Sequence, residues 1–435
     1  MKWFLGVLLL LATALVFDLG LLAYSMYALL GVMLVSRALA RVWAESLSAF
    51  RECNRYSAGV GDTVAVVIEL KNNGRAPVPW VLVEDLLPRH ALLPPPPRLA
   101  VKGRRLQMTM LRGRGRRVLT YQLECRQRGY FQIGPLVLET GDLFGLHRRH
   151  RVLSEPHFLL VYPEVVRIEG FDVASRRPIG EVRLTHRLYE DPTRIAGVRA
   201  YEAGDPLNRI HWRATARTGE LHSKLYEPST VAGATIVLDF HEASYPARHG
   251  EYRAELAVTA AASLAGAVYE MGRQVGLVTN GRDAADRIRQ EGWDYDHRSR
   301  RAARRAASML ETSDRLRPVV VPTRRGPEQF MRILETLARV ETTDGLTFSQ
   351  LIAETTSRLP RDATVLAILG SAGPETVAVL ANLRRRGFAV SVVLNTFEVH
   401  DFETAAGRLV AEGIETRHLE DKSAVATVCR DYVLR

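Results

Sequence analysis

A long apolar run at the start of the chain limits what the chain can fold into. Residues 3–35 contain a single charged side chain, Asp18. As one helix this run would be about 50 Å long, whereas the hydrocarbon core of a membrane is about 30 Å thick. Asp18 and Gly20 favour a break that leaves a short apolar arm on either side. The pattern therefore predicts a transmembrane helical hairpin over residues 1–36, with Asp18 at the far interface.

Basic residues flank both ends of this hairpin. Lys2 precedes it, and Arg37 and Arg41 follow it, so both ends are expected on the cytoplasmic side of the inner (plasma) membrane. The soluble part is then expected in the cytoplasm, and the scattered cysteines, without a CxxC pair, fit a reducing compartment. Two alternatives stay open: a cleaved signal peptide, which the second apolar arm disfavours, and a single span with the bulk of the chain outside the cell.

The apolar periodicity changes after the hairpin. Leu39, Val42 and Trp43 recur at helical spacing, which predicts a connecting helix over residues 37–57. From there the chain alternates between apolar and polar residues in short runs, with Gly and Pro about every ten residues. This pattern is typical of antiparallel sheets and predicts a β-sandwich domain over residues 58–153.

The last part of the chain has the opposite pattern. Continuous apolar runs such as "ATIVLDF" at 234–240 alternate with helical stretches, which predicts a doubly wound, mainly parallel α/β domain over residues 234–435. Residues 154–233 are assigned to a linker and a motif region. The Arg-rich stretch 281–318 stays open between a solvated helix or loop and a docking surface. The expected fold class is α+β multidomain: a hairpin, a sandwich and an α/β domain.

The string "YEAGDPLNRIHWRATARTGELHSKLYEPS" at residues 201–229 concentrates charged and aromatic side chains. Asp205 and Pro206 form a good helix start and Gly219 a good stop, which predicts a helix of about twelve residues between them. The following "ELHSKLYEP" alternates like a strand. Three arginines recur every four residues and would share one face of the helix: Arg209, Arg213 and Arg217.

Three interpretations of this motif compete. The favoured one is a structural network, in which neighbouring acids neutralise the arginines and Trp212 packs as an anchor at a domain junction. A partner or anion site is the second, and catalysis by His211 is the third, although no suitable Ser or Cys nucleophile stands near it. The candidate motif and interaction residues are Tyr201, Gly204, Asp205, Arg209, His211, Trp212, Arg213, Arg217, Lys224 and Glu227.

The motif "RAYEAGDPLNRIHWRATARTGELHSKLYE" resembles the signature of the DUF58 family (domain of unknown function 58). The stretches "RRVLTYQLECRQRGYFQIGPLVLETGDLFGL" and "VIELKNNGRAPVPWVLVEDLLP" match what precedes that signature in the family, and so does the apolar hairpin. The resemblance implies a membrane-anchored bacterial protein whose C-terminal half is similar to a von Willebrand factor A domain. It also implies an association with MoxR-type AAA+ ATPases, and no established enzymatic activity.

The resemblance raises the question of a metal site, because von Willebrand A domains hold a divalent ion with D-x-S-x-S after their first strand. Here the strand ends "LDFHEAS", so Asp239 is present but His241 and Ala243 replace the two serines. A hard cation prefers oxygen ligands. The site is therefore interpreted as degenerate, and no metal or other cofactor is expected.

The chain carries a formal net charge of +11, and part of that surplus is concentrated in the predicted sandwich. For a membrane-tethered protein, anionic lipid headgroups are the simplest partner of such residues; solvated strand edges are the alternative. Nucleic acid is not expected, because no recognised nucleic-acid-binding motif is present. The candidate membrane-surface contacts are Arg104, Arg105, Arg112, Arg114, Arg116 and Arg117.

Together these patterns predict a membrane-anchored, non-enzymatic adaptor or scaffold. Its expected partner, on the family resemblance alone, is a MoxR-type AAA+ ATPase acting in the assembly or maturation of envelope or other protein complexes. Two alternatives stay open. One is a cell-envelope hydrolase or transferase that uses His211 and Asp205, and the other is a metal-dependent extracellular adhesion module built on Asp239.

Overall fold

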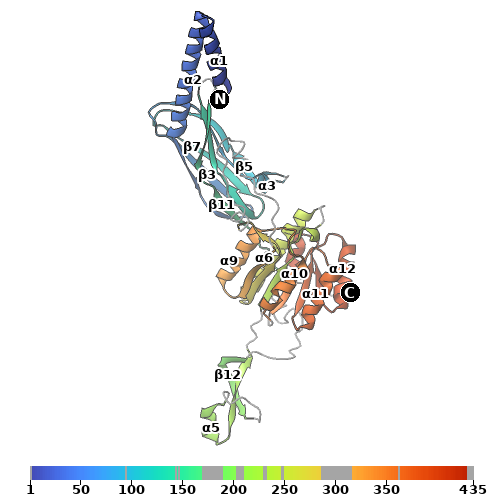
Figure 1. Cartoon of the computed structure of the whole chain (residues 1–435). Coiled ribbons are helices and arrows are strands. Elements are labelled where there is room, and N and C mark those ends of the chain that lie inside the picture. Colours follow the sequence, from blue (N-terminus) through green and yellow to red (C-terminus); the bar gives the residue numbers. More distant parts are fainter. Residues whose placement is uncertain are drawn as a thin grey trace. The chain divides into compact units, whose positions relative to one another are not determined.

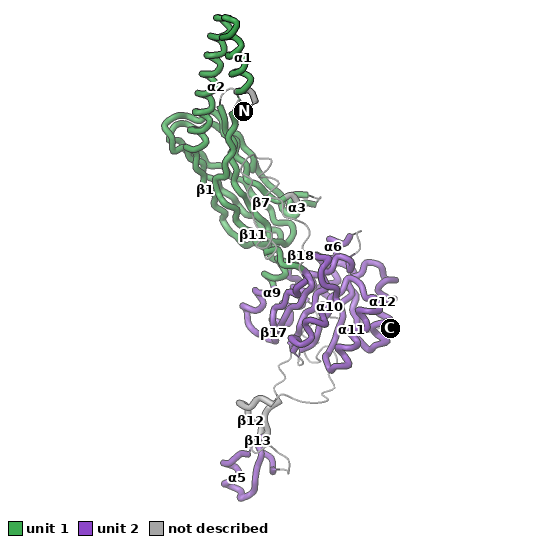
Figure 2. The backbone as a smooth tube through the Cα atoms, in the orientation of Figure 1, with its two compact units in different colours: residues 1–164, 282–314, 334–341 green, residues 165–281, 315–333, 342–435 purple. Residues whose placement is uncertain are grey.

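A computed structural model shows a chain of helices and several β-sheets, so the α+β class is confirmed (Figure 1). The chain divides into two compact units (Figure 2). Unit 1 comprises residues 1–164, 282–314 and 334–341, and unit 2 comprises residues 165–281, 315–333 and 342–435. The structure describes residues 2–93, 96–142, 145, 147–168, 190–201, 210–228, 233–245, 249–285, 316–360 and 363–428.

Two antiparallel helices open the chain, as the apolar run predicts. Helix α1 (Lys2–Val16) and helix α2 (Gly20–Ser46) are joined by a tight turn in which Asp18 has a positive φ of 49°. Helix α2 is long and apolar enough to cross a membrane, judged by length and composition, and α1 is a shorter apolar helix. The turn therefore lies where the single charge of the apolar run interrupts it.

The predicted connecting helix over residues 37–57 is helical only as far as Ser46, and the prediction is wrong for residues 47–57. Helix α2 continues without a break to Ser46, and strand β1 (Leu47–Cys53) follows at once. Leu47 and Cys53 face the core of the sandwich, and so does Arg51 between them. Leu47 and Phe50 also lie at helical spacing from Trp43, and this coincidence of the two periods explains the error.

The sandwich of unit 1 consists of two four-stranded sheets that share one apolar core. Its boundaries are wider than the predicted 58–153, because β1 and the strand at 157–162 belong to it. The first sheet has the order β1, β3 (Thr63–Asn72), β7 (Arg116–Cys125) and β5 (Leu99–Gly103). The second has the order β10 (Arg148–Ser154), β9 (Leu136–Gly141), β4 (Val78–Asp85) and β6 (Leu106–Leu111). A small third sheet contains β2 (Ser57–Gly59), β11 (His157–Tyr162) and β8 (Gly129–Ile133).

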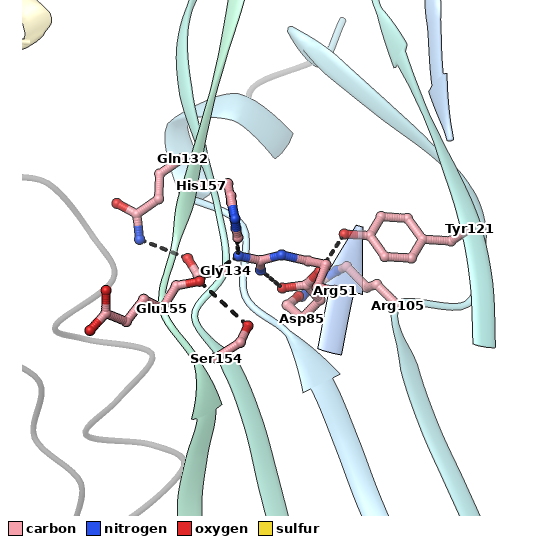
Figure 3. Close-up of polar contacts among 9 residues, drawn as sticks. All are labelled: Arg51, Asp85, Arg105, Tyr121, Gln132, Gly134, Ser154, Glu155 and His157. Carbon is pink, nitrogen blue, oxygen red and sulfur yellow. Dashed lines mark hydrogen bonds and ion pairs between the residues drawn. The ribbon is translucent and has the colours of Figure 1, made fainter. Parts of the chain in front are cut away.

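A polar cluster crosses the sandwich (Figure 3). The guanidinium of Arg51 donates to Asp85 at 2.7 Å, and both side chains are fully buried. Tyr121 donates to the other carboxylate oxygen of Asp85 at 2.7 Å, and Arg51 also contacts Nδ1 of His157 at 2.6 Å. Burial raises the pKa of the Asp85 carboxyl and lowers the pKa of His157. Each partner is held by the others, as buried charges require.

Unit 2 is built on a six-stranded sheet. Its order is β17 (Val319–Arg324), β15 (Gln274–Thr279), β14 (Gly233–Leu238), β19 (Ala363–Leu369), β20 (Val390–Leu394) and β21 (Glu415–His418). Neighbouring strands are parallel except at β17, which runs antiparallel to β15. In chain order this is 3-2-1-4-5-6, a doubly wound pattern whose switch point lies between β14 and β19.

Helices follow most of these strands. They are α6 (Gly250–Glu270), α9 (Pro327–Arg339), α10 (Phe348–Thr355), α11 (Pro374–Arg385), α12 (Val399–Ala411) and α13 (Lys422–Thr427). Helix α6 is alanine-rich and buried on most of its surface, which lets it pack closely on β14 and β15. The sequence also left out β17 and β21, which are short edge strands. The stretch 281–318 lies mostly outside the described residues.

Candidate functional site

The motif forms a small module of its own (Figure 1). Strands β12 (Glu190–Ala200) and β13 (His222–Pro228) pair in antiparallel fashion, and the short helix α5 (Trp212–Thr218) precedes β13. Gly219 ends α5 in the left-handed conformation at φ 79°, and its N–H donates to the carbonyl of Thr215 at 2.9 Å. The predicted stop of the helix at Gly219 is therefore confirmed.

His211 determines where α5 begins. Its Nδ1 accepts a hydrogen bond from the backbone N–H of Ala214 at 3.0 Å, so the imidazole caps the helix. The backbone N–H of His211 donates to the carbonyl of His222 at 2.8 Å, which connects the capping residue to β13. Helix α5 is thus seven residues long and begins at Trp212. The predicted single helix of about twelve residues up to Gly219 is wrong, because residues 210–211 are not helical, while Asp205 and Pro206 themselves lie outside the described residues.

This capping role limits what His211 can do chemically. An Nδ1 that accepts from a backbone N–H carries no proton, so the neutral ring has its proton on Nε2. No carboxylate contacts the imidazole among the residues that the structure describes. Asp205, the proposed catalytic partner, lies outside the described residues, as do Gly204 and Arg209.

One face of α5 is open to solvent. Trp212 is 67% exposed, and Arg213, Ala216 and Arg217 are exposed beside it. At 100° per residue these four positions span about 140° of the helix. Within the described part of the chain, neither arginine forms an ion pair. The interpretation of Trp212 as a packing anchor is therefore wrong, and the two described arginines are not neutralised by described acids.

The opposite side of the module holds the helix on the hairpin. Ile210 and Ser223 are buried and form a backbone bridge, and Thr215 accepts from the N–H of His222 at 3.1 Å. Tyr201 is half-buried and donates its N–H to Leu221 at 2.8 Å. Lys224 is half-buried in β13, where Glu227 also lies, although the Glu227 side chain is not described. Ile210 is the buried apolar side chain of this contact. The only signal for it in the sequence is an apolar residue between Arg209 and His211.

Asp239 lies at the carboxyl end of β14, beside the switch point of the sheet. Its two oxygens accept hydrogen bonds from Nδ2 of Asn280 at 2.8 Å and from Oγ of Ser244 at 2.5 Å. Asn280 also accepts from the N–H of Phe240 at 2.6 Å. Gly370 at the end of β19 lies so close that an added Cβ would be 2.3 Å from the carbonyl oxygen of Ser244. The segment 241–245 therefore covers the switch point, where doubly wound folds usually bind ligands.

These residues do not fit a divalent metal. The amide nitrogen of Asn280 donates to the carboxylate of Asp239, where a metal ligand would have to be free. The side chain of His241 has no oxygen ligand to offer, and its Nδ1 accepts from the N–H of Ala243 at 3.1 Å. Among the described residues, no three His, Cys, Asp or Glu side chains form a group that could hold a metal ion.

The six candidate membrane-contact arginines fall into two places in the sandwich. Arg112, Arg114, Arg116 and Arg117 lie in or next to the turn between β6 and β7. Arg104 and Arg105 lie in the turn between β5 and β6, where Arg105 donates to Glu84 and to the carbonyl of Asp85, both at 3.2 Å. The sequence analysis treated them as one surface, but the two turns lie at opposite ends of β6.

The sequence model of a family described as "Protein of unknown function DUF58" matches residues 197–293, which cover most of the motif module together with β14, α6 and β15. The "Uncharacterized protein YeaD" of Bacillus subtilis is 25% identical over 258 residues, which are 59% of this chain and 62% of that protein. The chain thus spans less than two thirds of the length of that relative. The resemblance to DUF58 is confirmed over the matched residues.

Solved structures show weak likeness. A CARDB domain of PF1109 from Pyrococcus furiosus is 17% identical with a TM-score of 0.18, and the match covers 27% of this chain and 94% of that domain. Proximal thread matrix protein 1 from the mussel byssus is 10% identical with a TM-score of 0.28, covering 45% of this chain and 46% of that one. These scores carry no argument about fold or function.

Proposed function

We propose that this protein is a membrane-anchored, non-enzymatic adaptor that binds a partner protein through the exposed face of α5. The observation that supports the proposal is a tryptophan, Trp212, left 67% exposed beside Arg213 and Arg217 on a helix that is fixed to a hairpin. Tryptophan and arginine dominate the binding energy of protein interfaces.

The anchor in this proposal is the helical hairpin. Helix α2 has the length and hydropathy of a membrane span, and Asp18 lies in the turn away from both flanking basic residues. In this proposal Lys2 and Arg37 lie on the cytoplasmic side of the inner membrane, as the positive-inside rule favours, and the soluble part is cytoplasmic. The proposal also treats unit 2 as a von Willebrand A-like domain, on the strength of its 3-2-1-4-5-6 strand order and the antiparallel β17.

A binding role agrees better than catalysis with the chemistry of the motif. The Nδ1 atom of His211 is occupied by the helix N-terminus, and Asp239 is occupied by Asn280 and Ser244. The first partner to test is a MoxR-type AAA+ ATPase, which the family resemblance suggests. Two exposed guanidinium groups call for an acidic surface on that partner.

The experiment is a pull-down of the full chain from detergent-solubilised membranes with the purified ATPase, with and without ATP. We expect recovery of the ATPase by the wild type, and a loss of at least about tenfold in affinity for Trp212→Ala, as for a hot-spot side chain. Phe397→Ala is the matched control, because Phe397 is an equally exposed aromatic residue (62%) elsewhere in unit 2. No recovery in either nucleotide state, or equal recovery by both variants, contradicts the proposal.

A further inference from the structure

A group of arginines gathers at one end of the sandwich, next to the end of α2. The turn between β6 and β7 packs on the turn between β3 and β4, where the N–H of Arg114 donates to the carbonyl of Gly74 at 2.8 Å. That second turn is tied to the helix, because the N–H of Asn73 donates to the carbonyl of Ser46 at 2.8 Å. We call the five arginines of these two turns and the start of β7 the arginine rim. Its members are Arg75, Arg112, Arg114, Arg116 and Arg117.

The arginine rim carries uncompensated charge. All five side chains are exposed. Arg116 lies 3.6 Å from Glu69, and the other four form no ion pair within the described part of the chain. Arg105, by contrast, is tied to Glu84 and Asp85 farther along the sandwich. The local packing is also close: an added Cβ at Gly113 would be 1.9 Å from the carbonyl oxygen of Arg75. The rim is therefore a preformed positive surface.

The helix fixes how far this rim lies from the apolar segment. Ser36 donates to the buried carboxylate of Asp142 at the β9–β10 turn, and Arg151 donates to the carbonyls of Ala44, Glu45 and Leu47 at 3.1 to 3.2 Å. Ten residues of helix between Ser36 and Ser46 rise about 15 Å. A headgroup layer takes up about 5 to 8 Å of that distance. The remaining distance between the headgroup layer and the rim is close to one Debye length at physiological salt, about 8 Å.

We infer that the arginine rim binds the anionic phospholipid headgroups of the bilayer that holds the helical hairpin, and so fixes the sandwich against the membrane surface. The inference rests on the membrane anchoring proposed above. It assigns the lipid contact to Arg75, Arg112, Arg114, Arg116 and Arg117 and withdraws it from Arg104 and Arg105. Arg37 lies on the helix between the rim and the apolar segment and adds to the same positive field, whereas Arg41 is paired with Glu45 at 2.9 Å.

The test uses the full chain, reconstituted into phosphatidylcholine vesicles with or without about 30% phosphatidylglycerol, an anionic lipid. A fluorophore is attached at Val118→Cys, because Val118 is 55% exposed and follows the rim on β7. Quenching by a nitroxide on the lipid headgroups then reports their proximity. Burial raises the pKa of Cys53 and of Cys125 to about 11, so these thiols do not compete for the label at neutral pH. Cys429 is replaced by Ser.

Two triple variants with the same loss of charge are compared. The rim variant is Arg112→Gln/Arg114→Gln/Arg117→Gln. The control variant is Arg55→Gln/Arg104→Gln/Arg126→Gln, whose three exposed side chains lie away from the rim. We expect anionic lipid to increase quenching in the wild type and the control, and the increase to disappear in the rim variant. Salt at 1 M, which shortens the Debye length to about 3 Å, removes the increase as well.

The inference is overturned if quenching does not depend on anionic lipid, or if the rim variant keeps the increase. In that case the rim faces another occupant, such as an acidic protein. A failure of the underlying anchoring is recognised separately, because sodium carbonate would then extract the wild-type chain from its native membranes. Retention after carbonate together with a lipid-independent signal contradicts the headgroup contact alone.

Discussion

At the scale of single residues, the buried pair Arg51–Asp85 is the feature that sequence patterns could least reveal. Arg51 stands at an inward position of β1, where an apolar residue is expected. Its partners come from residues 34 to 106 positions away along the chain, so no local pattern announces them. The same limit applies to Trp212, whose exposure depends on the strand behind α5 and not on its neighbours in sequence.

Gly134 should be required by this pair. An added Cβ at Gly134 would be 2.1 Å from Nη1 of Arg51, and the residue has a φ of +93°. We expect Gly134→Ala to reduce the free energy of unfolding by about 3 kcal/mol or more, because it displaces a buried guanidinium. Gly61→Ala is the control. Gly61 has a φ of +92° with nothing within 4 Å of an added Cβ, so this variant should lose only the backbone strain, about 1–2 kcal/mol. Equal losses in chemical denaturation would refute the role of the contact.

His157 should make stability depend on pH. Burial, followed by the charge of Arg51, lowers the pKa of His157 in the folded state below its unfolded value of about 6.5. The unfolded state then binds more protons, so this contribution is complete above pH 6.5 and is lost as the pH falls through the folded pKa. We expect Tm to fall between pH 7 and pH 5.5 in the wild type and to fall less in His157→Gln. His400→Gln, at an exposed position of α12, should keep the wild-type slope.

At the scale of secondary structure, the elements that the sequence predicts best are the ones with an unambiguous period. Strands β14, β15, β19 and β20 are continuous apolar runs with buried side chains on both faces, and their positions follow from the sequence. Strand β21 is half-exposed and polar, so nothing in its composition separates it from a loop. Helix α5 is shorter than predicted because the side chain of His211 caps it one residue before Trp212.

The capping role of His211 leads to a prediction that separates adaptor from enzyme. Asn is a good N-cap and cannot act as a general base, whereas Ala provides no cap. A helix of seven residues is marginal, so the loss of about 1 kcal/mol should unfold α5 in part of the population. We expect His211→Asn to keep ATPase recovery near the wild-type level and His211→Ala to lower it by about fivefold. Loss of function in both variants would favour chemistry at the imidazole.

At the scale of the whole molecule, the chain forms two units, each with its own core. The apolar pattern of the sequence predicts the boundaries of these units only approximately. The sandwich core and the core around the six-stranded sheet contain separate sets of residues. Their order along the chain was predictable from the change of period. The assignment of residues 334–341 to unit 1 was not, because it depends on contacts between residues distant in sequence, such as the hydrogen bond that Arg128 donates to the carbonyl of Leu337 at 2.6 Å.

Removal of the apolar arms should release the chain without unfolding it. A deletion of residues 2–35 keeps Ser36, which contacts Asp142, and keeps the helix end that Arg151 caps. We expect the truncated chain in the soluble fraction after cell lysis, with the β-rich circular dichroism of the full chain. Recovery of the truncated chain in the membrane fraction after a high-salt wash would show that the hairpin is not the anchor.

The continuity of α2 has a mechanical consequence. The helix passes from its apolar stretch into the flank of the sandwich with no glycine or proline between Val32 and Ser46. Hydrogen bonds hold it to the sandwich at Ser36, through Asp142, and at its final turn, through Arg151. In the proposed bilayer arrangement the chain therefore has no hinge where α2 leaves the membrane. If the span tilts in a thinner bilayer, the sandwich tilts by the same angle. The orientation of the sandwich relative to the membrane would therefore depend on the thickness of the bilayer.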